Sequence, residues 1–213
     1  VAQNKERSIQ LLIQSIGTIN QEQLTKRFDE YRESLKQIAQ RIENSKAPPT
    51  DIWEIEAASF IKGFPKFHQI LWLDSNYVVR KIVRKNHQGL SHDQAFPISE
   101  SDRKEFENKK TVFRLTFDDH FSTSTIQIFI PVYWDLAFQG VLAGELSSGD
   151  FFKKSLSELV EKEFSSIISY QNKIVYAEGL DKIPQKVQVL HFEGDISLGT
   201  LVFNLVLYPN SLF

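Results

Sequence analysis

A long stretch that favours helix without interruption is the feature that most constrains how this chain folds. Residues 3–43 contain no proline, and Gly17 is their only glycine. A helix over this stretch is about 60 Å long, which exceeds the size of one small domain. It ends before Pro48 and Pro49, because paired prolines cannot continue a helix.

Apolar side chains recur along this helix at a helical spacing. They occur at Ile9, Leu12, Ile13, Ile16 and Ile19, and then at Leu24, Phe28, Tyr31, Leu35, Ile38 and Ile42. From Leu24 onward steps of four and three residues alternate, as in a seven-residue repeat, whereas a step of five after Ile19 interrupts the stripe. The stripe fits two arrangements equally well. The helix either packs along the chain's own core, or it is a stalk that also pairs with a second copy as a homodimer.

The rest of the sequence predicts strands and short helices in two groups. The expected strands are 68–73, 77–84, 111–117, 125–134, 140–146, 163–170, 173–178, 187–192 and 198–207, with short helices at 52–60, 99–110 and 151–160. This order predicts an α+β fold with two antiparallel sheets. The expected segments are residues 1–47 as the stalk or dimerisation helix, 48–155 as a larger lobe and 156–213 as a smaller lobe.

The larger lobe is expected to be covered on both sides of its sheet. Residues 70–73 are all apolar, and residues 126–134 contain Gln127 as their only polar amide. An antiparallel sheet with one wet face would alternate between polar and apolar side chains. The long helix is the expected cover for one face. The short helices and loops would cover the other face and leave a cavity.

A candidate binding site follows from the alternation of side chains along the strands. Joining the mixed faces of the strands brings together Arg80, Arg114, Thr116, Gln127, Phe129 and Tyr133, and Gly140 and Gly144 are expected to leave room beside them. Apolar walls with a few convergent polar groups suit a small ligand, and two guanidinium groups favour a carboxylate or another anion. The alternative is a partly solvated face on which the arginines pair with surface acids.

Two tryptophans complete the candidate ligand-binding set. Trp72 and Trp134 lie in expected strands, where a tryptophan more often belongs to the core than to a ligand platform. Trp134 stands at a strand end beside Asp135 and is the better candidate for the rim of a pocket.

Composition excludes several classes of function. The net charge of −2 lacks the basic excess that a nucleic-acid-binding protein carries. The absence of cysteine excludes disulfides, cysteine zinc sites and cysteine nucleophiles. The histidines match no zinc signature, and no nucleophile elbow, phosphate loop or dinucleotide fingerprint occurs. We therefore expect no cofactor, no metal site, no catalytic residues and no partner nucleic acid, and no segment approaches the length of an apolar membrane span.

Three segments resemble a known family. Residues 64–74 (FPKFHQILWLD), followed by Val78-Val79-Arg80, are similar to the opening of CHASE-like extracytoplasmic sensor domains, which are tandem PAS-like modules. Residues 128–133 with 139–142, and the ending 201–209, resemble two later strands of that family. One departure is that Arg84-Lys85 follows Val83, where the family often has a proline.

The resemblance implies a periplasmic input domain of an inner-membrane protein, held between two membrane helices outside this sequence. Residues 48–155 would form the membrane-distal, ligand-binding PAS-like lobe, and residues 156–213 the membrane-proximal one. The expected function is to bind a small molecule and to signal across the membrane to a histidine kinase or a cyclic-di-nucleotide enzyme. The alternative is a periplasmic module that docks a protein and has no small ligand.

Overall fold

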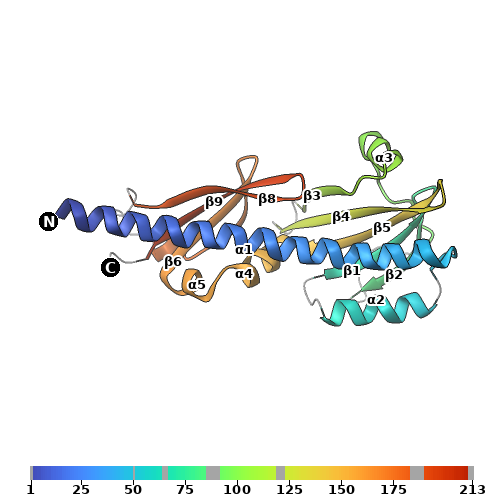
Figure 1. Ribbon diagram of the computed structural model, residues 1–213, viewed down its shortest axis with the longest axis horizontal. Coiled ribbons are helices and arrows are strands. Elements are labelled where there is room, and N and C mark those ends of the chain that lie inside the picture. Colours follow the sequence, from blue (N-terminus) through green and yellow to red (C-terminus); the bar gives the residue numbers. More distant parts are fainter. Residues whose placement is uncertain are drawn as a thin grey trace. The chain divides into compact units, whose positions relative to one another are not determined.

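The computed structural model describes residues 2–49, 51–63, 67–84, 92–118, 123–182 and 190–210 (Figure 1). The predicted α+β class is confirmed, with one long N-terminal helix and two antiparallel sheets. The helices are α1 (Ala2–Ser45), α2 (Asp51–Gly63), α3 (Glu100–Glu107), α4 (Ser148–Ser155), α5 (Glu158–Glu163) and the 3-10 turn η1 (Leu180–Lys182). The strands are β1 (Phe67–Asp74), β2 (Val79–Arg84), β3 (Val112–Asp118), β4 (Thr123–Trp134), β5 (Ala137–Ser147), β6 (Phe164–Tyr170), β7 (Lys173–Glu178), β8 (Phe192–Leu198) and β9 (Leu201–Pro209).

Most element boundaries agree with the sequence predictions, and the clearest difference concerns the last hairpin. The predicted strand 187–192 lies largely outside the described residues, and β8 instead begins at Phe192 and runs to Leu198. Gly199 supplies the turn before β9, because its φ of 63° is a conformation that favours glycine. Residues 193–197 of β8 therefore form part of a strand that the sequence analysis did not predict.

The chain forms two compact units, each with its own sheet. The four-stranded unit comprises Val1–Asp29 with Ser148–Phe213, and the five-stranded unit comprises Glu30–Ser147. Helix α1 thus contributes its first part to one unit and its last part to the other. The assignment of segments 1–47, 48–155 and 156–213 to a stalk, a distal lobe and a proximal lobe stays a prediction.

The buried seam of α1 is continuous, which the sequence pattern did not predict. Buried positions follow one another in steps of three and four residues, at Ile13, Gly17, Asn20, Leu24, Phe28, Tyr31, Leu35, Ile38 and Ile42. Ile19, which the apolar pattern assigned to the stripe, is 56% exposed. The interruption expected after Ile19 is absent because the seam passes through Gly17 and Asn20. Neither residue belongs to the apolar pattern from which the stripe was predicted.

The five-stranded sheet has the order β2-β1-β5-β4-β3 and is covered on both faces, as predicted. One face packs against α1: a Cβ added to Gly144 would lie 2.9 Å from Leu35 and 2.6 Å from Phe67. The opposite face, called here the covered face, lies under α3 and the segment 92–99. Its core is Leu71, Leu73, Val79, Phe96, Ile98, Phe106, Val112, Phe129, Val141 and Ala143.

The expectation that two glycines leave room for a ligand is wrong. Gly144 accommodates side chains on the α1 side of the sheet. A Cβ on Gly140 would lie 2.0 Å from the carbonyl oxygen of Leu73 and 3.0 Å from the Trp72 ring. Both glycines therefore permit close packing within the fold, and neither opens a space on the covered face.

The four-stranded sheet has the order β7-β6-β9-β8. Aromatic rings fill its core: Phe28 of α1 meets Phe151 edge-on at 5.9 Å between centroids, and Phe152 meets Phe203 at 5.3 Å. The buried Asn20 of α1 accepts a hydrogen bond of 2.9 Å from the backbone N–H of Ser157, the N-cap residue of α5. Among the described residues, no helix combines the length and the apolarity that a membrane crossing requires.

Candidate functional site

Strand register joins several of the predicted site residues on the covered face. In the β3–β4 pair, Arg114 lies opposite Gln127, and Phe129 lies opposite Val112. Thr116 continues the same face, where its hydroxyl donates to the carbonyl oxygen of Thr125 at 3.4 Å. The side-chain alternation read from the sequence therefore placed this part of the face correctly.

The same register extends a row of polar side chains across the whole sheet. Arg84 of β2 pairs with Gln69 of β1, which pairs with Glu145 of β5. Glu145 pairs in turn with Gln127 of β4, and Gln127 pairs with Arg114 of β3. These five residues, one from each strand, are called here the polar row.

Hydrogen bonds connect four members of the polar row. The Arg84 Nε donates to Gln69 Oε1 at 3.1 Å. The side-chain amides of Gln69 and Gln127 both donate to the carboxylate of Glu145. Gln69 donates to Oε2, and Gln127 donates to Oε1 at 2.7 Å. The carboxylate of Glu145 is thus the centre of the row, and its charge is met by neutral amides on both sides.

Two polar atoms of the row are buried without a hydrogen-bond partner among the described residues. They are Nη2 of Arg84, a donor, and Oε1 of Gln127, an acceptor. Gln127 is 7% exposed. Leaving a buried polar atom unpaired costs about 1–3 kcal/mol. These two atoms are therefore the positions on the covered face where a ligand would gain most from a hydrogen bond.

Arg114 is held by groups of the protein itself. Its Nη2 bonds the Asp102 carboxylate of α3, and its Nη1 donates to the carbonyl oxygen of Pro97 at 3.0 Å. Its guanidinium also lies 5.1 Å from the centre of the Phe129 ring. Burial raises the pKa of Asp102, but the hydrogen bonds from Ser99 and Arg114 outweigh this and hold that pKa below its ordinary value.

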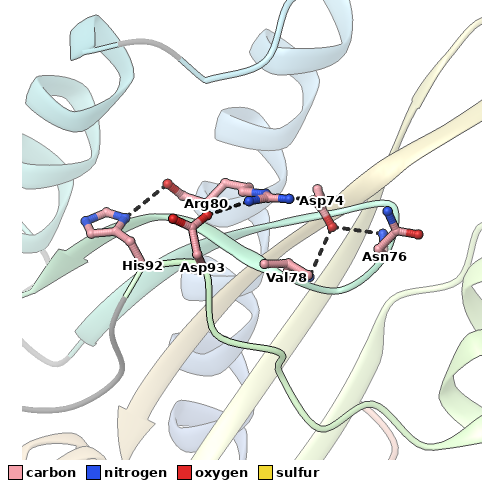
Figure 2. A network of polar contacts seen from close by, with 6 residues as sticks. All are labelled: Asp74, Asn76, Val78, Arg80, His92 and Asp93. Atoms are coloured by element: carbon pink, nitrogen blue, oxygen red, sulfur yellow. Dashed lines mark hydrogen bonds and ion pairs between the residues drawn. The ribbon is translucent and has the colours of Figure 1, made fainter.

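Arg80 is not a member of the polar row. It is the second residue of β2 and lies beside the turn between β1 and β2, next to Asp74 (Figure 2). The strands are bulged there: Leu73 pairs with Val79 and Trp72 with Lys81, so Arg80 has no opposite residue. This breaks the alternation from which its face was predicted. Its guanidinium instead bonds Asp74 at 2.7 Å.

A second carboxylate completes the network that Figure 2 shows. Asp93 also bonds the Arg80 guanidinium, and the His92 ring nitrogen Nδ1 lies 3.1 Å from the Arg80 carbonyl oxygen. Asp74 meanwhile accepts bonds from the backbone N–H groups of Asn76 and Val78. The network ties segment 92–93 to the β1–β2 turn, and a ligand anion would have to displace a carboxylate to reach Arg80.

Of the predicted aromatic residues, Phe129 and Tyr133 lie on the covered face and the tryptophans do not. The Tyr133 hydroxyl donates to the carbonyl oxygen of Phe106 in α3. Trp72 is between Leu71 and Leu73 of the covered face, so it points to the opposite side, where Gly140 approaches it. Trp134 follows Tyr133 and also alternates to the other side.

Sequence reasoning missed three members of the polar row: Gln69, Arg84 and Glu145. A signal was present, because Glu145 is the only charged residue of β5 and Gln69 directly precedes the apolar run Ile70–Leu73 of β1. Their common face became visible only with the pairing of β1 and β5, which are far apart in the sequence. Within the described residues, no group of three or more histidine, aspartate or glutamate side chains could hold a metal ion.

Comparison with known proteins gives matches of structure and none of sequence. No family model matches the chain, and no curated protein matches it. The extracellular domain of the proposed histidine kinase vpHK1S-Z8 superposes with a TM-score of 0.76 at 9% identity, covering 97% of this chain and 96% of that one. A domain of a proposed sensory box/GGDEF family protein from Vibrio parahaemolyticus gives a TM-score of 0.74 at 10% identity, covering 96% and 97%.

A chemoreceptor domain shows the same architecture. The ligand-binding domain of the amino acid chemoreceptor PctC of Pseudomonas aeruginosa PAO1, in complex with GABA, gives a TM-score of 0.67 at 9% identity and covers 93% of this chain and 98% of that one. This chain has the fold of these sensor domains. The predicted two-lobed, PAS-like sensor fold is therefore confirmed, whereas the narrower CHASE-like assignment stays a prediction.

Proposed function

We propose that this chain is the extracytoplasmic sensory domain of a membrane signal transducer and that it binds a small molecule on the covered face of the five-stranded sheet. Its fold is that of domains from three other proteins: a proposed histidine kinase, a proposed sensory box/GGDEF family protein, and an amino acid chemoreceptor whose domain was solved in complex with GABA. The domain itself acts by binding and carries out no reaction. Flanking membrane helices would anchor it, with residues 48–155 distal and 156–213 proximal to the membrane.

The pair of unpartnered buried atoms at Arg84 and Gln127 is the observation that carries this proposal. An enclosed face with a few unmet hydrogen-bonding groups and apolar walls is typical of small-molecule sites. The proposed ligand-binding residues are Gln69, Arg84, Arg114, Thr116, Gln127, Phe129, Tyr133 and Glu145.

The signal would pass through α1 to a second copy of the chain. Four apolar residues form a stripe near the start of α1: Ile9, Leu12, Ile16 and Ile19. Leu12 and Ile19 are 48% and 56% exposed, and Ile9 and Ile16 are half-buried. Their spacing of three, four and three residues is the repeat by which two helices pair in a coiled coil. A second copy would cover this stripe, and ligand binding would change the packing of the paired helices.

Self-association tests this part of the proposal. Ile19→Glu should weaken the dimer measured by sedimentation, because a charge at the pairing stripe is costly to bury. Leu159→Glu is the matched control, since Leu159 is 49% exposed on α5 and lies outside the stripe. Equal sedimentation of the two variants would contradict pairing through α1.

A thermal-shift screen of the purified protein tests ligand binding. A ligand at one hundred times its dissociation constant adds about 2.7 kcal/mol of stability, which raises Tm by about 5–10 °C for a protein of this size. Gln127→Leu should reduce this shift to about half or less, because a tenfold weaker ligand at the same concentration adds only about 1.4 kcal/mol. Gln139→Leu is the matched control and should retain the shift. Gln139 is in β5, and its side-chain amide donates to the carbonyl oxygen of Ala137. No shift with any ligand would favour the protein-docking alternative.

A further inference from the structure

The charges on the covered face are already balanced within the protein. Arg114 is paired with Asp102, and their side chains are only 24% and 17% exposed. Arg84 belongs to the same hydrogen-bonded row as the carboxylate of Glu145, through Gln69. The polar row together with Asp102 of α3 therefore contains two cations, Arg84 and Arg114, and two anions, Glu145 and Asp102.

This balance determines which ligand charge the site tolerates. An anion would bring an uncompensated negative charge next to Glu145, and burying an unpaired charge is costly. The two unpartnered atoms require opposite hydrogen-bonding groups from a ligand. Nη2 of Arg84 is a donor and pairs with an acceptor, whereas Oε1 of Gln127 is an acceptor and pairs with a donor. A ligand that supplies one of each remains neutral overall.

The strand order also sets the length of such a ligand. Arg84 is in β2 and Gln127 is in β4, with β1 and β5 between them. Three strand spacings of about 4.8 Å separate their backbones by about 14 Å. Because side chains in strands stand roughly perpendicular to the sheet, the ends of the two side chains are about as far apart as their backbones. A hydrogen bond at each end covers about 3 Å, which leaves about 8 Å for the ligand. One amino-acid residue spans about 3.5 Å and two or three residues about 7–10 Å.

We propose that the polar row binds an elongated, net-neutral ligand of the size of a zwitterionic dipeptide or tripeptide, with its acceptor end at Arg84 and its donor end at Gln127. This inference rests on the proposed small-molecule site and specifies its ligand class. It replaces the anion that two arginines suggested in the sequence. Glu145 lies between the two ends and accepts from the ligand with the lone pairs that its amide partners leave free.

The test is a thermal-shift and calorimetric comparison of four pools on the intact chain: net-neutral di- and tripeptides, single neutral amino acids, dicarboxylates and diamines. We expect the peptide pool to give the largest shift and its best member to bind at least tenfold more tightly than any single amino acid. A larger shift with dicarboxylates, diamines or single amino acids would overturn the inference while leaving the sensor function intact. No shift in any pool would overturn both the inference and the small-molecule function.

Two variants test the assigned ends separately. Gln127→Leu and Arg84→Gln should each weaken the best peptide at least tenfold, and blocking the peptide's amino group should mimic the Gln127 change. Gln139→Leu should bind as the original chain does. If Gln127→Leu fails to fold, Arg84→Gln and a peptide with an amidated carboxyl group still test the Arg84 end. Equal losses of affinity from either change, without a further loss when they are combined, support a contact between Arg84 and the carboxyl group. Additive losses refute that contact.

Discussion

Replacing Gly17 by alanine should destabilise the protein, although alanine is the better helix former. A Cβ at this position would lie 2.1, 2.2 and 2.5 Å from three atoms of the Phe192 ring. Carbon atoms in contact prefer about 3.5–4.0 Å. Phe192 is only 3% exposed, so its ring is packed inside the fold. The substitution therefore forces either the ring or the helix to move.

The magnitude follows from two opposing terms. Alanine gains about 1 kcal/mol over glycine inside a helix. Overpacking a core costs about 1–3 kcal/mol, and an overlap of more than about 1 Å with three ring atoms places this site at the upper end. We expect the free energy of unfolding to fall by about 2 kcal/mol. With Phe192→Ala present the overlap disappears, so the same Gly17→Ala change should stabilise by about 1 kcal/mol.

Urea unfolding of the four proteins of this cycle measures the effect. Far-UV circular dichroism should be the main probe, because Trp53, Trp72 and Trp134 all belong to the five-stranded unit, whereas Gly17 and Phe192 belong to the other. Tryptophan fluorescence then reports whether the two units unfold together. Thr18→Ala, at the exposed neighbouring position, is the control and should change stability by less than about 0.5 kcal/mol. If Gly17→Ala stabilises the protein with Phe192 present, the packing argument is refuted.

Two further predictions concern polar contacts. Asn20→Leu removes the buried acceptor of the Ser157 N–H and should lower the free energy of unfolding by about 1–3 kcal/mol in the same urea assay; unchanged stability would mean that this N–H finds another acceptor. Burial raises the pKa of Asp74, but hydrogen bonds from Val78, Arg80 and Asn76 outweigh it and lower that pKa. A lowered pKa stabilises the fold at neutral pH, and this stabilisation is lost as the pH falls through the folded-state value. The difference in Tm between the original chain and Arg80→Gln should therefore shrink on acidification, and a constant difference would contradict this.

Local patterns were enough to predict most of the secondary structure and part of one face of the candidate site. The absence of proline and the apolar spacing determine α1, because helix formation depends on neighbours three and four residues apart. Alternation in β3 and β4 placed Arg114, Thr116, Gln127 and Phe129 on one face, since these strands are adjacent in sequence and regular in structure. The same rule failed at Arg80, where a bulge inserts one extra residue.

The sequence by itself determined a long helix followed by strands that are apolar on both faces, which is sufficient for an α+β fold with covered sheets. Tertiary structure decided which polar residues meet. Gln69 and Glu145 are 76 residues apart and join only because β1 lies beside β5 at the centre of the sheet. Gly17 likewise belongs to the buried seam of α1 only because the ring of Phe192 lies against it. In both cases a partner that is distant in the sequence gives the residue its role.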